Sequence, residues 1–139
     1  MSKKLMVDIA VTVERSAVLL IARAKPPFMD RLVLPGGHVE ADDSSFAQAA
    51  ARELAEEVGI VIVPAELHWL MRLDTPGRDP RYDTASVVYH VDVSAAVAAQ
   101  AAAGSDARAL AFYPINELQP EQLGFDHWLA ISRLEEVLA

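Results

Sequence analysis

The chain of 139 residues contains no cysteine. It therefore has no disulfide framework, no zinc site built on thiolates and no cysteine nucleophile. Long hydrophobic runs are also missing: the apolar stretch 95–103 is short and rich in alanine, whereas a helix needs about 20 apolar residues to cross a bilayer. The first residues carry two lysines, but Asp8 interrupts the apolar run that a signal peptide requires. We therefore expect a cytoplasmic protein with no membrane partner.

Positive charge is scarce, because 12 Lys and Arg residues face 20 Asp and Glu residues, giving a formal net charge of −8. Such a chain repels a polyphosphate backbone unless its basic residues are tightly clustered, so a nucleic-acid polymer is an unfavourable partner. A small anion remains compatible, since a bound divalent cation inverts the local sign of a carboxylate-lined site. The length and the hydrophobic fraction of 53% fit one core, and we expect a single domain over residues 1–139.

Apolar runs alternate with turn residues along the chain. A sharp turn is expected at residues 35–37, where proline removes a backbone donor and two glycines permit positive φ. The Ala-rich stretch 95–104 fits either a short helix or a loop, residues 74–83 fit a polar loop, and residues 116–118 fit a short helical turn. Strands are predicted over 7–13, 17–22, 31–34, 60–63, 67–73 and 86–93.

Two longer helices are predicted, over residues 45–58 and 125–138. In the first, Ser45 followed by Gln48 is a capping-box pattern, and Gly59 is a helix stop. Apolar residues recur at helical spacing in both segments. Strands interleaved with two such helices predict an α/β domain with helices on the faces of a mixed sheet.

Three glutamates of the first helix suggest a metal site. Glu53, Glu56 and Glu57 are spaced by three and four residues, so they lie on one side of the helix. A hard divalent cation such as Mg²⁺ or Mn²⁺ relieves the repulsion among such carboxylates. Taken alone, the pattern is more typical of a solvated acidic face in which Arg52 pairs with Glu56. The preceding Pro-Gly-Gly turn favours the metal site, because its carbonyl groups could complete it.

Part of this helix resembles a family signature. Gly37 and the string RELAEEVGI over residues 52–60 resemble the Nudix hydrolase pattern, in which Gly, five residues, Glu and seven residues precede Arg-Glu-aliphatic-x-Glu-Glu-x-Gly-aliphatic. The second half matches at every specified position. The first glutamate is absent: Ser44 stands eight residues before Arg52, and the spacing from Gly37 is one residue longer, as though loop 41–44 carried an insertion. Asp42 or Asp43 is expected to replace that glutamate.

The resemblance implies a Nudix-type α/β/α sandwich and an enzyme that cuts a pyrophosphate bond in a small nucleotide-like substrate. In family terms Mg²⁺, with Mn²⁺ as a substitute, is held by Glu53, Glu56, Glu57 and the carbonyl of Gly36. The catalytic residues are Glu53, Glu57 and Arg52, and either Glu53 or a loop carboxylate is the general base. Such a metal neutralises the pyrophosphate and stabilises charge on the leaving phosphate. Because relatives are frequently dimers, a homodimer is also an expectation from the resemblance.

Two further stretches resemble the ADP-ribose pyrophosphatase branch of the family, namely RDPR at 78–81 and LGFDH at 123–127. They favour ADP-ribose as the substrate, cleaved to AMP and ribose 5-phosphate. The residues assigned to substrate binding are Arg78, Arg81, Gly37 and Asp83.

Each stretch also has a structural interpretation. Residues 78–81 could be a self-paired turn that orders the loop, which is at least as plausible as direct substrate contact. Asp126 could cap the last helix, with His127 partly buried beside Trp128, and we favour that interpretation over catalysis.

The acidic residues in the second half of the chain do not decide which substrate is cleaved. No glutamate occurs between Glu66 and Glu117, so a loop base would have to be Asp74, Asp79, Asp83, Asp92 or Asp106. This departure keeps a nucleoside triphosphate pyrophosphohydrolase as an alternative. A second alternative is a non-catalytic module that binds an ADP-ribose-type ligand. Related sensors carry an attached DNA-binding domain, and the expectation that 139 residues leave no room for one favours the enzyme.

Overall fold

The computed structural model describes residues 3–102 and 107–139. Its centre is a mixed sheet in the order β3-β2-β1-β6-β5, with β4 paired to β1 and β7 paired to β2. β1 and β6 are parallel, and the other strand pairs are antiparallel. The strands are β1 (Lys4–Val13), β2 (Ala17–Arg23), β3 (Leu32–Val33), β4 (Gly36–His38), β5 (His68–Leu73), β6 (Thr84–Val93) and β7 (Ala107–Pro114).

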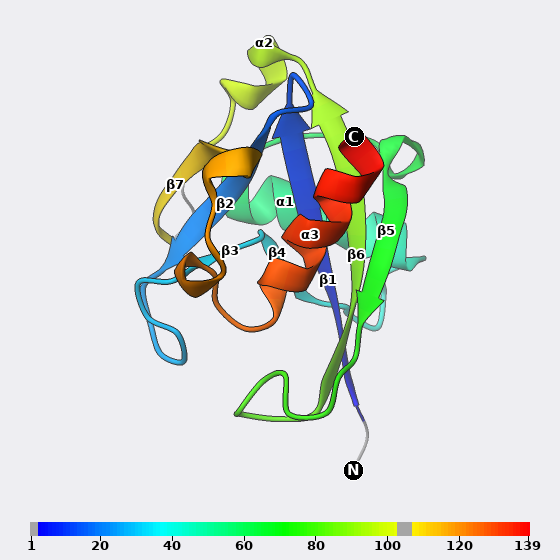
Figure 1. Cartoon of the computed structure of the whole chain (residues 1–139). Coiled ribbons are helices and arrows are strands. Elements are labelled where there is room, and N and C mark those ends of the chain that lie inside the picture. Colours follow the sequence, from blue (N-terminus) through cyan, green and yellow to red (C-terminus); the bar gives the residue numbers. More distant parts are fainter. Residues whose placement is uncertain (1–2, 103–106) are drawn as a thin grey trace.

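Helices cover both faces of the sheet (Figure 1). α1 (Phe46–Val58) lies on one face and α3 (His127–Leu138) lies on the other, while α2 (Ala95–Ala98) is a short turn. Alternation along β1 explains the two layers, because Val7, Ile9 and Val11 pack in the core with α1, whereas Ala10 packs in the core with α3. The predicted α/β/α sandwich with a mixed sheet is confirmed.

The caps of α1 follow the sequence pattern. The Ser45 hydroxyl accepts a hydrogen bond from the backbone N–H of Gln48 at 3.0 Å. The Gln48 side chain bonds back to the N–H of Ser44, one residue before the cap, at 3.2 Å. Gly59 ends the helix with φ 74°, and its N–H donates to the carbonyl of Ala55. These caps fix both ends of the helix that carries the glutamates.

Two predictions about local structure are wrong. Residues 60–63 form no strand, because Val61 and Val63 are exposed and the chain turns into a 3₁₀ helix at Pro64–Glu66. Residues 35–37 form no positive-φ turn either, because Gly36–His38 continues as β4 and pairs with β1. One strand, β7, was not predicted from the Ala-rich sequence around it. For residues 95–104, where a helix and a loop were both possible, the structure has a helix at Ala95–Ala98. Residues 103–106 lie outside the described part.

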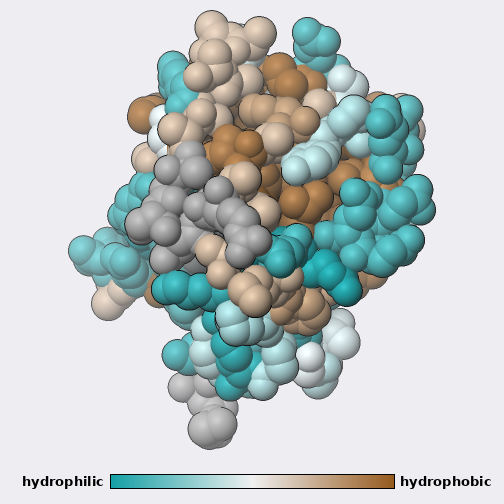
Figure 2. Space-filling view, turned by 90° about the vertical axis from the view of Figure 1, so that its left-hand side faces the viewer, coloured by the Kyte–Doolittle hydropathy of each residue, from teal (hydrophilic) through white to brown (hydrophobic). Residues whose placement is uncertain are grey.

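The surface is chemically mixed. On the face seen in Figure 2, hydrophobic residues gather in the upper middle and hydrophilic residues lie along the right and lower edges. Within residues 3–102 and 107–139, none of the helices has the length and apolar character needed to cross a bilayer.

Candidate active site

The two glycines of β4 bring α1 close to the sheet. A Cβ atom at Gly37 would collide with the carboxylate of Glu53, and one at Gly36 would collide with the carbonyl of Val7 and with Asp8. The glycines therefore serve close approach rather than a turn. Glu53 is pressed against the β4 backbone, with its side chain 15% exposed. Burial raises the pKa of Glu53, although a hydrogen bond from Arg52 opposes this effect.

Arg52 gathers several partners beside this glutamate. Its Nε and Nη2 donate to the two carboxylate oxygens of Asp43, each at 2.9 Å. Its Nη1 donates to Glu53 at 3.0 Å, and Nη2 also donates to the carbonyl of His38 at 3.0 Å. The hydrogen bonds from Arg52 hold the pKa of the Asp43 carboxyl below its ordinary value.

Asp43 thus takes the place expected for the missing glutamate. It stands six residues after Gly37, which is the spacing of the family pattern, so the extra residue lies between Asp43 and Arg52. Asp42, the other candidate, is exposed. The contact with Arg52 decides between the two acids.

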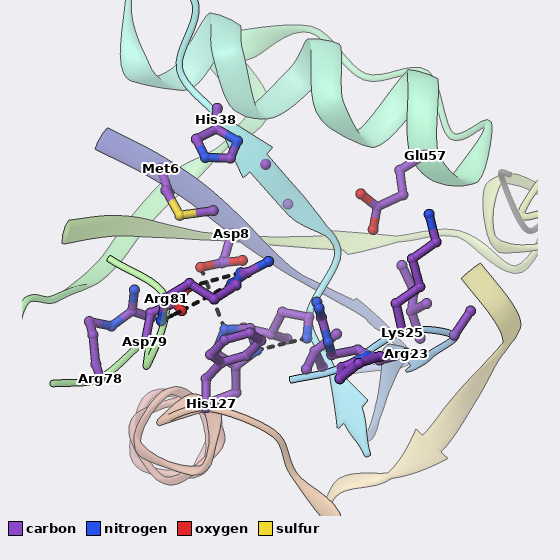
Figure 3. Close-up of a pocket in the computed structure, with 18 of the residues that line it drawn as sticks. Met6, Asp8, Arg23, Lys25, His38, Glu57, Arg78, Asp79, Arg81 and His127 are labelled. Atoms are coloured by element: carbon purple, nitrogen blue, oxygen red, sulfur yellow. Dashed lines mark hydrogen bonds and ion pairs between the residues drawn. The ribbon is translucent and has the colours of Figure 1, made fainter. Parts of the chain in front are cut away.

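The other two glutamates of the cluster face different surroundings. Glu56 has a side chain that is 59% exposed and pairs with Arg52 at 3.3 Å, as the solvated-face interpretation expects. Glu57 lines a cavity and points into it from α1 (Figure 3). Among the residues that the structure describes, no three His, Asp or Glu side chains form a group ready to hold a metal ion.

The cavity has a volume of about 350 Å³ and lies between α1, β4, the loop after β2, the loop before β6 and the start of α3. Figure 3 shows Glu57 and Lys25 on one side, Asp8 and His127 nearer the middle, and Arg78 on the far side. The basic residues of this acidic chain therefore do cluster, which makes the cavity suitable for an anion. The charged residues among its lining are Arg23, Lys25, Arg78, Arg81, Asp8, Glu57 and Asp79.

The RDPR stretch is held by internal ion pairs. Arg78 has a side chain that is only 5% exposed, and its Nε and Nη2 donate to the two oxygens of Asp126 at 2.8 Å each. Arg81 donates to Asp79 through Nε and Nη2, at 3.1 and 2.9 Å. The structural interpretation of this stretch as a self-paired turn is therefore confirmed for Arg81 and Asp79. Asp126 stands at the N-cap position of α3, as predicted, but its side chain makes no capping hydrogen bond.

The remaining predicted residues lie elsewhere. Asp83 does not line the cavity and instead pairs with Lys3 at 3.7 Å. Asp74 pairs with Arg72, and Asp92 accepts a hydrogen bond from Thr12. Of the five candidate loop acids, Asp79 lines the cavity, and Asp106 lies outside the described residues.

A family model described as the NUDIX domain matches residues 3–134. The chain belongs to this family. Its predicted membership of the Nudix family is therefore confirmed. No curated protein matches the sequence.

Solved structures similar to this Nudix chain include a MutT/nudix family protein from Enterococcus faecalis, with 25% identity and a TM-score of 0.85 over 99% of this chain and 63% of that one. The NUDIX domain of Shewanella oneidensis NrtR complexed with ADP ribose has 26% identity and a TM-score of 0.85, over 100% of this chain and 90% of that one.

A third similar structure is a bifunctional NMN adenylyltransferase/ADP ribose pyrophosphatase from Francisella tularensis, complexed with AMP and a Mn ion. It has 25% identity and a TM-score of 0.81, over 99% of this chain and 42% of that one. This Nudix chain therefore spans less than two thirds of the Enterococcus and Francisella proteins.

Sequence reasoning missed part of the Nudix cavity. Arg23 and Lys25 follow a predicted strand, where nothing in the pattern marked them as cavity residues. Asp8 did leave a signal, because it is the one charged residue inside the apolar run 5–13 that forms β1. His127 was predicted to be partly buried, and it is buried as well as lining the cavity.

Proposed function

We propose that this Nudix domain is a Mg²⁺-dependent pyrophosphohydrolase, with Mn²⁺ as a substitute, that cleaves ADP-ribose to AMP and ribose 5-phosphate. The observation that carries the proposal is the position of Glu57, which points from α1 into a cavity lined by basic side chains. A diphosphate needs positive charge beside the carboxylates of α1, and this cavity offers both. The ADP-ribose complex of the NrtR domain and the name of the Francisella enzyme support this choice of substrate.

The donor atoms are of the type that a hard divalent cation takes, and the glutamate side chains would turn toward one another to hold it. Glu53, Glu56, Glu57 and the carbonyl of Gly36 would hold it, and all of them offer oxygen, which Mg²⁺ and Mn²⁺ prefer. Burial raises the pKa of Glu53, so its charged form is under-stabilised in the absence of a further positive charge. The cation supplies charge neutralisation of the diphosphate and of the leaving phosphate.

The chain itself binds the substrate and moves the proton. Arg23 and Lys25 attract the phosphates from the wall that faces Glu57. Of the two acids considered as the general base, Glu53 is the one carried by α1, the helix that would hold the metal. Asp79 is the poorer base, because burial raises its pKa but the hydrogen bonds from Arg81 outweigh burial and lower it. We therefore assign the acceptance of the proton from the attacking water to Glu53.

A substrate panel with the variant Glu57→Gln tests the proposal. The protein is incubated with Mg²⁺ and ADP-ribose, NADH, dinucleoside polyphosphates or nucleoside triphosphates, and the products are identified. We expect AMP and ribose 5-phosphate from ADP-ribose. Glu57→Gln should lower kcat by about 100-fold or more, since even outer-shell partners of a metal contribute roughly 10- to 100-fold. Its melting temperature should stay near that of the parent chain.

The control is Glu135→Gln, which removes an exposed carboxylate from α3 and should leave the rate unchanged. Release of pyrophosphate from nucleoside triphosphates, with no cleavage of ADP-ribose, would favour the alternative enzyme. Binding of ADP-ribose without turnover would favour the non-catalytic module. Full activity of Glu57→Gln would remove that residue from the site.

A further inference from the structure

Asp8 is a buried carboxylate that lines the cavity and lies apart from Glu57 (Figure 3). It belongs to β1, and its side chain is only 9% exposed. Its Oδ2 atom accepts a short hydrogen bond of 2.5 Å from the hydroxyl of Ser86, on the neighbouring strand β6. The Nε2 atom of His127 lies 3.7 Å from the same oxygen. One donor, the Ser86 hydroxyl, therefore bonds to Oδ2, and the ring of His127 lies on the same side of the carboxylate.

The proton of His127 can be placed from its other ring nitrogen. The backbone N–H of Leu34 donates to Nδ1 at 3.0 Å, so Nδ1 carries the lone pair and the hydrogen sits on Nε2. Burial also lowers the pKa of His127, which favours the neutral ring. The Nε2–H group is therefore on the side of the ring that faces Asp8.

The other oxygen of Asp8, Oδ1, is left for a ligand. Among residues 3–102 and 107–139, no protein group donates a hydrogen bond to it. A side chain at Gly36 would collide with this atom, and the glycine leaves that space free. Gly36 and Asp8 both line the cavity. An acceptor that has no protein donor and lies at the surface of a cavity is suited to recognising a donor on the bound molecule.

The walls around Asp8 favour a planar ring. Met6, Val33, Leu34 and Phe125 also line the cavity. Arg78, the nearby cation, is already occupied by Asp126 and Thr84. Apolar side chains beside a carboxylate suit a heteroaromatic ring that bears an N–H group. Arg23 and Lys25 bring positive charge to the cavity, where they face the phosphates.

We propose that Asp8 is a specificity-determining residue that accepts a hydrogen bond from the exocyclic amino group of a nucleobase. The inference rests on the proposed function, because the base is that of the nucleotide substrate. It follows that a 6-amino purine is preferred to a 6-oxo purine. A 6-oxo group would place its oxygen, which is an acceptor, against Oδ1. Neither the 6-oxo oxygen nor Oδ1 would then receive a hydrogen bond at that contact.

The variant Asp8→Asn should reverse this preference. The Ser86 hydroxyl donates to the Oδ2 position, and Nε2 of His127 lies 3.7 Å from it, so the amide oxygen of asparagine is favoured there. The amide NH₂ then takes the position of Oδ1 and offers a donor to the cavity. A donor suits the 6-oxo group. A purely structural role for Asp8 would instead weaken both bases in the same proportion.

The test measures binding of AMP and IMP by calorimetry, and kcat/KM for ADP-ribose and inosine diphosphate ribose. The parent chain should favour the amino base by at least about tenfold, since leaving a buried acceptor unpaired costs enough for that ratio. Asp8→Asn should favour the oxo base. Asp74→Asn, which changes an exposed carboxylate paired with Arg72, is the matched control and should keep the parent ratio.

Equal binding of AMP and IMP to the parent chain would overturn the inference, and this result needs no variant to fold. An equal loss for both bases in a folded Asp8→Asn protein would overturn it as well. The two proposals fail separately. If the chain prefers AMP but hydrolyses no nucleotide, the proposed enzyme activity is rejected and the proposed role of Asp8 is supported. If the chain cleaves ADP-ribose but does not discriminate between the bases, only the proposed role of Asp8 is rejected.

Discussion

At the scale of single residues, the pair of Arg52 and Asp43 controls the glutamates of α1. In Asp43→Asn, Arg52 loses its charged partner and is free to turn toward Glu53 and Glu56, which it already contacts. A guanidinium there competes with a divalent cation for the same oxygens. We expect a higher Mg²⁺ concentration for half-maximal turnover, with a smaller effect on kcat at saturating Mg²⁺. The measurement is the rate as a function of Mg²⁺ concentration.

Asp42→Asn is the matched control, because Asp42 is the exposed neighbour. It should keep the parent dependence on Mg²⁺. If both variants behave like the parent chain, Asp43 does not act through Arg52 on the metal site.

The residue scale also shows what a pattern can reveal. Helical spacing put three glutamates on one side of α1, but their surroundings differ, because Glu53 packs against Gly37, Glu56 is exposed and Glu57 lines the cavity. Spacing could not say that Glu57 enters a cavity while Glu56 stays in solvent, because that depends on where β4 and the loop after β2 lie. Nor could it choose between Asp42 and Asp43, since the choice depends on the path of an exposed loop.

At the scale of elements, the loop between β5 and β6 is fastened to α3 by Arg78. This side chain is buried and makes a bidentate pair with Asp126 and a bond to Thr84 at 2.7 Å. Arg78→Ala would leave a mostly buried carboxylate without its partner. Breaking such a pair costs about 3–5 kcal/mol. We therefore expect a clear loss of stability in chemical unfolding, together with weaker substrate binding because the loop carries Arg81.

Arg72→Ala provides the comparison for this loop. Arg72 pairs with Asp74, and both side chains are about half exposed, at 48% and 54%. Surface pairs of this kind contribute about 0 to 1 kcal/mol, so the variant should unfold almost like the parent chain. Similar losses in Arg72→Ala and Arg78→Ala would show that burial does not distinguish the two pairs.

Secondary-structure elements were predicted best where the deciding interactions lie within the element itself. Capping residues and 3.6-residue spacing predicted α1 well, because both act within the helix. The prediction failed for residues 35–37, where glycines that usually permit a turn instead permit close contact with Glu53 and β1. It also failed for residues 60–63, whose β-branched side chains have no neighbouring strand to pair with. Both errors concern tertiary neighbours that no local window contains.

At the scale of the whole molecule, basic residues gather at one cavity although the chain as a whole is acidic. A net charge of −8 argues against binding a polyanion. The fold nevertheless brings basic residues from β2, the loop after it and the loop before β6 to one cavity. Composition gives the total charge and cannot give this arrangement, because the basic residues are far apart in sequence. A cavity that gathers basic side chains is compatible with the predicted small anionic ligand.

Whole-molecule stability should depend on pH through His90, which lies on β6. The Thr12 hydroxyl donates to Asp92 at 2.7 Å, so the 2.9 Å contact of Thr12 with Nε2 of His90 requires that the ring donates. Burial lowers the pKa of His90 below its ordinary value of 6.5, with Asp92 opposing and Arg15 and His68 adding to the effect. Below pH 6.5 the unfolded chain therefore binds the proton more readily than the folded one, and stability falls as pH decreases.

The variant His90→Gln keeps a donor for Thr12 and cannot titrate. Between pH 7.5 and 5.5 it should lose less unfolding free energy than the parent chain, by at most about 1.4 kcal/mol per pH unit for one proton. His127 titrates in both proteins, so its contribution cancels in the comparison. His68→Gln, at the exposed cross-strand neighbour, should keep nearly the parent slope. Parallel pH profiles for His90→Gln and the parent chain would mean that burial of His90 has no influence on the stability of the sheet.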